Sequence, residues 1–238
     1  IMPLPKLNTP EYSLNVPSSD EEIKYRPFVV AEEKLLLIAQ ETGDEDSMLN
    51  AVKQIVEGCT FNNLDVEHMP LFDLEYIFLN IRAKSVGETA TIKVKCPDDE
   101  KTEVEVEIFL PDVKVEIGED HDNKIKLTDS MMLEMTYPRF DTVTNLKKQY
   151  PKAGDVEMTF HMIASTMMTL YDGEEEYDMM DETHDEKMKF IDQMTQMQFS
   201  KMQKFFETSP KLTHTINVTN PKTKKKGKYK LEGIAAFF

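Results

Sequence analysis

The chain has 238 residues, of which 40% are hydrophobic and 30% are charged, the balance of a folded protein rather than of a disordered segment. This length is enough for one large domain or two small ones, with a core that needs no disulfide or metal to hold it. The formal net charge is -16, and such a field repels phosphate backbones and disfavours general nucleic-acid binding.

Cys59 and Cys96 are the only cysteines, and we expect both to be free thiols in a reducing environment. No apolar run approaches the length of a membrane span, and the start of the sequence shows no charged segment followed by an apolar one. We therefore expect a protein that does not enter a membrane, and that stays where it is made or leaves inside a particle.

The first part of the chain, residues 1–87, is expected to hold a β-hairpin and three helices. Apolar residues alternate with polar ones on both sides of a turn at 17–20, which predicts two strands over roughly 11–30. Apolar residues at helical spacing then predict three helices, over 31–42, 44–58 and 73–86.

The second part, residues 88–138, changes to a period of two. Short runs rich in valine and isoleucine alternate with charged residues, and turn residues separate the runs. We expect these runs to form a small antiparallel sheet that is polar on one face. The predicted strands cover 92–96, 104–108, 113–117, 125–127 and 131–137.

The third part, residues 139–238, is expected to be helical and to end in a short β-hairpin. A short helix is predicted over 141–150, and two long methionine-rich helices over 155–171 and 185–207. The acidic stretch between these two helices, 172–186, is expected to be a solvated, mobile loop because its like charges repel one another. Together the three parts predict one interlocked unit of the α+β class.

Catalytic and metal-binding patterns are absent from the sequence. There is no phosphate-binding glycine loop, no nucleophile elbow, no zinc-protease helix and no Cys-x-x-Cys pair. The spacing of acidic residues after Asp172 does not match a calcium loop. We expect the five histidines to be structural or exposed, and we expect no enzyme activity, no cofactor and no metal. The histidines are at positions 68, 121, 161, 184 and 214.

Two predicted hairpin tips, at Cys96-Pro97 and Asn220-Pro221, lie where zinc knuckles place their ligands, but one cysteine cannot assemble a metal site. We interpret these tips as small surface projections. The second tip continues into a lysine run between Lys222 and Lys230. A solvated turn is the simplest interpretation of that run, and binding to nucleic acid, to an acidic partner or to the chain's own acidic stretch are the alternatives.

Methionine is unusually frequent, with 16 residues, most of them between Met131 and Met202. Methionine fills irregular cores and is also common on adaptable binding surfaces. On a continuous helix over 185–207, the methionines and phenylalanines spread around much of the circumference. This spread predicts two buried faces, one internal and one for a partner, with Met197 and Phe199 on the partner side.

Several segments, taken in order, resemble a family of T4-like bacteriophage baseplate proteins. The resemblance spans the chain and is dense over about 3–96 and at the extreme end. Its strongest match is the pair of runs Phe72–Leu79 and Ile81–Glu88. The other matching segments are Tyr12-Ser13-Leu14, Ile23–Phe28, Leu231-Glu232-Gly233 and Phe237-Phe238.

The resemblance implies a protein of the central hub of a contractile-tail baseplate, or a chaperone that assembles the hub. It implies other baseplate or hub proteins as partners, the infected host's cytoplasm during assembly as the location, and the virion tail baseplate as a second location. It brings no catalytic residues, small-molecule substrate or nucleic acid. The alternative functions are an acidic protein that inhibits a host nucleic-acid-binding protein by DNA mimicry and, more remotely, a metal-dependent hydrolase.

The candidate binding residues come from the two regions that suggest a partner. Some lie in the segments that carry the resemblance and the others on the methionine-rich helix, and self-association through the latter is also expected. The candidates are Tyr25, Arg26, Phe28, Met197, Phe199, Phe237 and Phe238.

Overall fold

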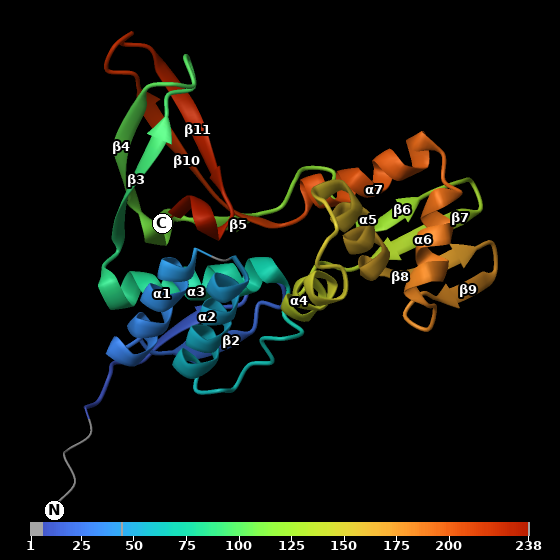
Figure 1. Cartoon of the computed structure of the whole chain (residues 1–238), viewed down its shortest axis with the longest axis horizontal. Helices are drawn as coiled ribbons and strands as arrows, with labels where there is room; N and C mark the ends of the chain where they lie inside the picture. The colour runs from blue at the N-terminus through green and yellow to red at the C-terminus, as the bar shows by residue number, and fades with distance from the viewer. Residues whose placement is uncertain (1–6, 44, 238) are drawn as a thin grey trace, which may run out of the picture. The chain divides into compact units, whose positions relative to one another are not determined.

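The structure is a computed structural model that describes residues 7–43 and 45–237, and these residues form two units (Figure 1). Unit 1 contains the residues up to Val66, Phe72–Glu116 and the residues from Lys211 onward, and unit 2 contains Glu67–Leu71 and Ile117–Pro210. Both units combine helices with antiparallel strands, which confirms the α+β class.

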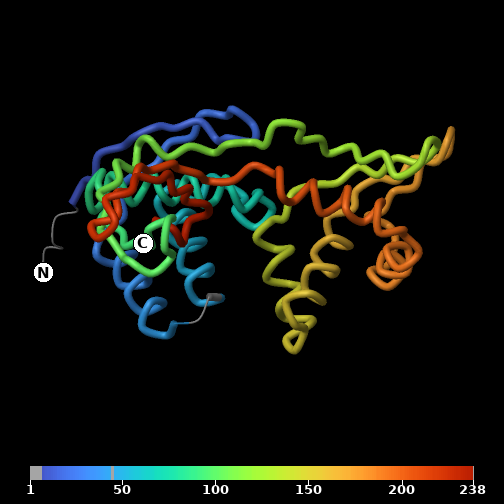
Figure 2. The backbone as a smooth tube through the Cα atoms, turned by 90° about the horizontal axis from the view of Figure 1, so that it is seen from above, coloured from blue at the N-terminus to red at the C-terminus, as the bar shows by residue number. Residues whose placement is uncertain are grey.

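The two units are interleaved along the sequence. The colours in Figure 2 show that the beginning, the middle and the end of the chain contribute to unit 1, whereas unit 2 comes almost entirely from one continuous segment. The division into three consecutive parts, 1–87, 88–138 and 139–238, stays a prediction. Local periodicity identifies elements, but it carries no information on which distant elements share a core.

Unit 1 begins with the predicted hairpin and the predicted helices. The hairpin is β1 (Tyr12–Asn15) paired antiparallel with β2 (Glu22–Tyr25). The three helices are α1 (Val30–Thr42), α2 (Glu45–Cys59) and α3 (Leu71–Val86). Glu32 fixes the start of α1, because its carboxylate accepts the backbone N–H of Val29 at 2.9 Å and pairs with Arg26 at 2.7 Å.

Helix α3 is the most deeply buried helix of unit 1. Its apolar residues recur at helical spacing, as predicted, and Phe78 is fully buried. The buried Asp73 in its first turn accepts the backbone N–H of Ser18 at 3.0 Å, which ties α3 to the turn of the first hairpin. The other buried apolar residues of α3 are Phe72, Leu74, Ile77, Leu79, Ile81 and Ala83.

Two longer hairpins complete unit 1 and lie side by side (Figure 1). One consists of β3 (Thr89–Lys95) and β4 (Glu103–Phe109), and the other of β10 (Lys211–Thr219) and β11 (Lys226–Glu232). Their inward residues share one core with the end of α3 and with two short 3-10 turns. These turns are η1 (Leu110–Asp112) and η2 (Ile234–Phe237).

A short strand, β5 (Lys114–Glu116), joins unit 1 at the point where the chain leaves for unit 2. It pairs antiparallel with β10, and Val115 lies opposite Leu212. The strands predicted over 88–137 are all present, but they belong to three different sheets rather than to one. The reason is that the partner of β5 is supplied by the far end of the sequence.

Unit 2 contains a four-stranded antiparallel sheet in the order β6-β7-β8-β9. Three of its helices, α5, α6 and α7, share a core with this sheet. The strands are β6 (Lys124–Lys126), β7 (Met131–Met135), β8 (Met167–Asp172) and β9 (Glu175–Asp178). The helices are α4 (Phe140–Gln149), α5 (Asp155–Thr166), α6 (His184–Asp192) and α7 (Gln196–Thr208).

Two expectations for unit 2 are wrong at the boundary near Met167. The helix predicted over 155–171 ends at Thr166, and the following residues form β8, which pairs with β7. The acidic stretch predicted as an irregular loop over 172–186 contains β9, which forms a tight hairpin with β8. Gly173 allows this turn because its φ is +64°, a left-handed value that glycine adopts without strain.

The single helix predicted over 185–207 is also wrong, because the chain breaks between α6 and α7. The side chain of Thr195 accepts the backbone N–H of Gln198 at 3.3 Å, and the side chain of Gln198 accepts the backbone N–H of Thr195 at 2.8 Å. This reciprocal pair starts a new helix. Each helix then buries its own face, so most of the apparent spread of apolar residues disappears.

Replacing Phe78 with alanine is expected to lower the free energy of unfolding by about 3–5 kcal/mol, because a fully buried aromatic ring leaves a cavity. Met197→Ala is the control, since this side chain is 74% exposed and its loss should change stability by less than about 0.5 kcal/mol. Urea denaturation of both variants measures the difference. Equal stabilities would contradict the central place of Phe78 in the core.

Candidate interaction surfaces

The described residues contain no group of three or more histidine, cysteine, aspartate or glutamate side chains that could hold a metal ion. Both cysteines are buried free thiols, and burial raises the pKa of Cys59 to about 11. Among the helices of 7–43 and 45–237, none combines the length and the apolar composition of a membrane span.

Two histidines that are distant in the sequence meet in unit 2. Nδ1 of His161 on α5 lies 2.8 Å from Nε2 of His184 on α6, and the ring of Tyr150 stacks on His161 at 3.7 Å between centroids. Burial lowers the pKa of His184, and the neighbouring His161 lowers it further. One ring nitrogen donates to the other, so the pair connects two helices rather than forming a ligand set.

The tips of the two long hairpins of unit 1 are joined by a buried asparagine. The side-chain amide of Asn220 donates to the carboxylates of Asp98 at 2.9 Å and Asp99 at 3.0 Å. Its carbonyl oxygen accepts the backbone N–H groups of Lys222 at 2.8 Å and Thr223 at 3.3 Å. Asn220 is 1% exposed, so a single side chain satisfies donors and acceptors from both tips.

The carboxylates at this junction are strongly stabilised in their charged form. Hydrogen bonds from Thr223 and Asn220 lower the pKa of Asp98, and the side chain and backbone of Thr102 lower that of Asp99 well below its usual range. Burial raises the pKa of the neighbouring Cys96 thiol. A neutral thiol beside two ionised, hydrogen-bonded carboxylates is a structural arrangement and leaves no vacant ligand.

Glu75 on α3 carries a carboxyl group whose pKa is strongly raised. Burial raises the pKa of its carboxyl to about 7, against the opposing effect of a hydrogen bond from the backbone of Ile234. Ile234 opens the 3-10 turn η2. A carboxyl that is half protonated near neutral pH therefore contacts the C-terminal segment.

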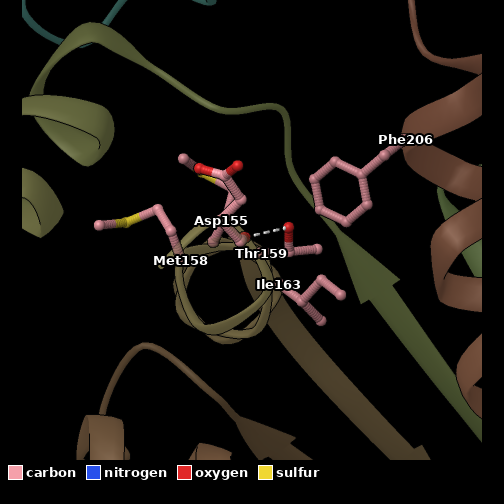
Figure 3. A pocket seen from close by; sticks show the side chains of 6 residues that line it. Asp155, Met158, Thr159, Ile163 and Phe206 are labelled. Atoms are coloured by element: carbon pink, nitrogen blue, oxygen red, sulfur yellow. Dashed lines mark hydrogen bonds between the residues drawn. The ribbon is translucent and has the colours of Figure 1, made fainter. Parts of the chain in front are cut away.

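An apolar groove on unit 2 is the clearest candidate for binding. It has a volume of about 370 Å³ and lies between α5 and the end of α7. Figure 3 shows Phe206 projecting from α7 toward the side of α5 that carries Thr159 and Ile163, whereas Met158 extends away from Phe206. The hydroxyl of Thr159 donates to the backbone carbonyl of Asp155 at 2.8 Å, so it adds no free donor to the groove. The remaining lining residue is Met162.

The N-terminal candidates for partner binding contact other parts of unit 1. Tyr25 is 2% exposed, and its ring lies 5.7 Å from that of Tyr12. Phe28 is buried, and Arg26 pairs with Glu32. These side chains make contacts within unit 1, and their role in binding a partner stays a prediction.

The candidates at the C-terminus and on α7 are placed differently from one another. Phe237 is fully buried in the core of unit 1, and Phe238 lies outside the described residues. Phe199 is half-buried and stacks on Phe160 at 4.8 Å, whereas Met197 is the exposed member of the pair. Among the six candidates within the described residues, only Met197 is both apolar and exposed.

The groove was missed because its residues come from two helices that the sequence places far apart. Methionine content indicated α5 and α7 in general, but the phase of α7 depends on the break at Thr195. With α7 starting there, Phe205 and Met202 face the core and Phe206 lies at the border of that face. Noticing that Thr195 precedes Gln198 by three residues could have revealed the break.

The geometry therefore defines an α+β protein that carries an apolar, methionine-lined groove on unit 2. The chain matches the family described as T4 bacteriophage base plate protein over residues 9–238, and it belongs to that family. This match confirms the resemblance drawn from the sequence and identifies a phage tail baseplate protein. No curated protein and no solved structure matches the chain.

Replacing Asn220 with alanine is expected to lower the free energy of unfolding by about 1–3 kcal/mol, because the hydrogen bonds that this buried side chain makes to two carboxylates and to its own turn are lost. Asn217→Ala is the matched control, since Asn217 lies on the exposed face of the same hairpin. Thermal unfolding of both variants measures the effect. If the two variants melt alike, the junction contributes nothing to stability.

Glu75 is expected to make stability fall as pH rises. Its pKa is about 7 in the folded chain and near 4.5 when unfolded, so the folded state holds the extra proton between these values. From about pH 4.5 to pH 7, the wild type should lose about 3 kcal/mol of unfolding free energy relative to Glu75→Gln. Denaturant titrations at several pH values measure this difference, and a constant difference would mean that Glu75 is ionised in both states.

Proposed function

We propose that this chain is a non-enzymatic component of the contractile-tail baseplate that acts by binding other proteins, as a hub subunit or as a chaperone of hub assembly. Membership of the baseplate family gives the setting. The observation that carries the proposal is the apolar groove between α5 and α7. The absence of a metal-binding cluster among the described residues is compatible with a binding role.

The chemistry of the groove suits a protein segment. Met158 and Met162 offer unbranched, polarisable side chains that adapt to irregular apolar partners. Phe206 adds an aromatic ring from α7 to the lining of the same groove (Figure 3). An amphipathic helix whose apolar residues recur at helical spacing would fill such a groove and remove it from water.

The rim of the groove suggests the charge of the partner. Asp155 lies in the first turn of α5 and lines the groove. Two exposed glutamates are next to lining residues in the sequence: Glu157 precedes Met158 on α5, and Glu207 follows Phe206 on α7. A partner helix with a lysine or arginine beside its apolar face would therefore be favoured over an acidic one. We infer a neutral-to-basic amphipathic helix from another baseplate protein as the occupant, met in the host cytoplasm during assembly.

Replacing Met158 with glutamate is expected to abolish binding to the partner while the fold is kept, because it places a charge in the apolar groove. Met197→Glu is the matched control, since it makes the same change on α7 at a residue that does not line the groove. The measurement is co-purification with other proteins of the same baseplate, with circular dichroism as the check on folding. Loss of binding in Met197→Glu alone would move the interface to the start of α7.

Mass spectrometry of purified virions separates the two forms of the proposal. A hub subunit is present in the tail in a fixed ratio to the other baseplate proteins. A chaperone is absent from the virion, yet baseplates fail to assemble when the gene is deleted. A chain that is absent from virions and dispensable for baseplate assembly would contradict both forms.

A further inference from the structure

The outer face of the C-terminal hairpin carries three lysines, of which only Lys230 has an acidic partner in the part of the chain that the structure describes. Lys226, Lys228 and Lys230 alternate along β11, so they project on the same side, about 7 Å apart. The residues directly opposite them on β10 are uncharged, and all six are exposed. We call this surface the lysine face, and its residues are Thr215, Asn217, Thr219, Lys226, Lys228 and Lys230.

On the neighbouring hairpin, lysines of one strand lie opposite glutamates of the other strand. On β3 and β4, Lys93 lies opposite Glu105 at 3.7 Å between nitrogen and oxygen, and Lys95 lies opposite Glu103. Cross-strand pairs of opposite charge stabilise a sheet. On the lysine face Lys226 and Lys228 have no ion-pair partner among the described residues, and only Lys230 pairs, with Glu232 of its own strand.

A complementary surface lies on unit 2 of the same chain. The hairpin of β8 and β9, which we call the acidic hairpin (172–178), carries five carboxylates in seven residues. Asp172 lies directly opposite Glu175, an arrangement in which like charges repel. Among the described residues none of the five has an ion-pair partner, and Glu176 and Asp178 alternate along β9 as the lysines do along β11.

Both surfaces also lie on edge strands. β11 ends the sheet β11-β10-β5, and β9 ends the sheet β6-β7-β8-β9. All four residues of β9 are exposed. Lysines on an edge strand can also serve to prevent pairing with the strand of another protein. That role alone would not account for the acidic residues on the second edge strand, β9.

We propose that the lysine face of one copy of this chain binds the acidic hairpin of a second copy. The two surfaces match in charge, in the two-residue spacing of their charged side chains and in their position at sheet edges. The contact is electrostatic, so it forms at low ionic strength and weakens as salt screens it. It is distinct from the apolar groove, and it stands whether or not the groove binds a helix.

A second copy fits the lysine face better than a nucleic acid does. The net charge of the chain is -16, so the chain as a whole repels phosphate backbones. The acidic hairpin supplies part of this negative charge, and the lysine face of another copy attracts it. The lysine face contains no arginine for bidentate phosphate contacts and no exposed aromatic ring for stacking on bases.

The test is a charge swap between two matched double variants. K226E/K228E reverses the lysine face, and E174K/E176K reverses the acidic hairpin at side chains that make no hydrogen bond among the described residues. Sedimentation velocity measures association at low ionic strength, where the Debye length is about 30 Å, and at about 1 M salt, where it is about 3 Å. We expect the wild type to associate at low salt, with a dissociation constant at least about tenfold larger at high salt.

Each double variant alone is expected to be monomeric at low salt, and an equimolar mixture of the two is expected to associate again. K148E/K152E is the control, because it changes the net charge as K226E/K228E does but at exposed lysines of unit 2 that belong to neither surface. It should still associate, as should Met158→Glu, which tests the groove separately. A wild type that stays monomeric at low salt, or a mixture that fails to associate, overturns the proposal. Binding of labelled duplex DNA by the wild type that K226E/K228E abolishes would assign the face to nucleic acid and overturn it as well.

Discussion

The arrangement of the chain depends on the short antiparallel pairing of β5 with β10. Val115 lies opposite the fully buried Leu212, and the whole segment from Ile117 to Pro210 is inserted between these two strands. Just beyond the pairing, the backbone N–H of Gly118 donates to the carbonyl of Thr208 at 2.9 Å. A Cβ at position 118 would lie 2.8 Å from that of Thr208, so only glycine permits this approach. The inserted unit therefore leaves and returns at one place, which lets it carry its own core and its own surfaces.

Elements whose cause is local could be predicted from the sequence. The apolar residues of α3 have one period, and the alternation in β3 and β4 has another, and both follow directly from backbone geometry. Turn residues indicated the hairpin tips at Pro97 and Pro221. The sequence also showed the cluster of lysines between Lys222 and Lys230. It did not show their organisation into one face, because this required the register that places Thr219 opposite Lys226.

The features that could not be predicted are those that distant segments create. Nothing in the sequence near His161 indicates His184, and nothing near Asp98 indicates Asn220. The break before α7 changed the phase of every apolar residue after it, and so moved the apolar border from the region of Phe199 to that of Phe206. A break missed inside one predicted helix thus changed which residues were expected at the surface, although the methionine content pointed to the correct helices.

The junction at Asn220 joins the tips of the two hairpins by hydrogen bonds, in addition to the apolar core that their inward residues share. Paired hairpin tips in zinc ribbons are fixed by four ligands around a metal. Here hydrogen bonds join the tips: the side-chain amide of Asn220 donates to Asp98 and Asp99, and the hydroxyl of Thr223 donates to Asp98. Because hydrogen bonds keep the pKa values of Asp98 and Asp99 low, these two acceptors stay charged until strongly acidic pH. The same junction connects the hairpin that carries the lysine face to the neighbouring hairpin of unit 1.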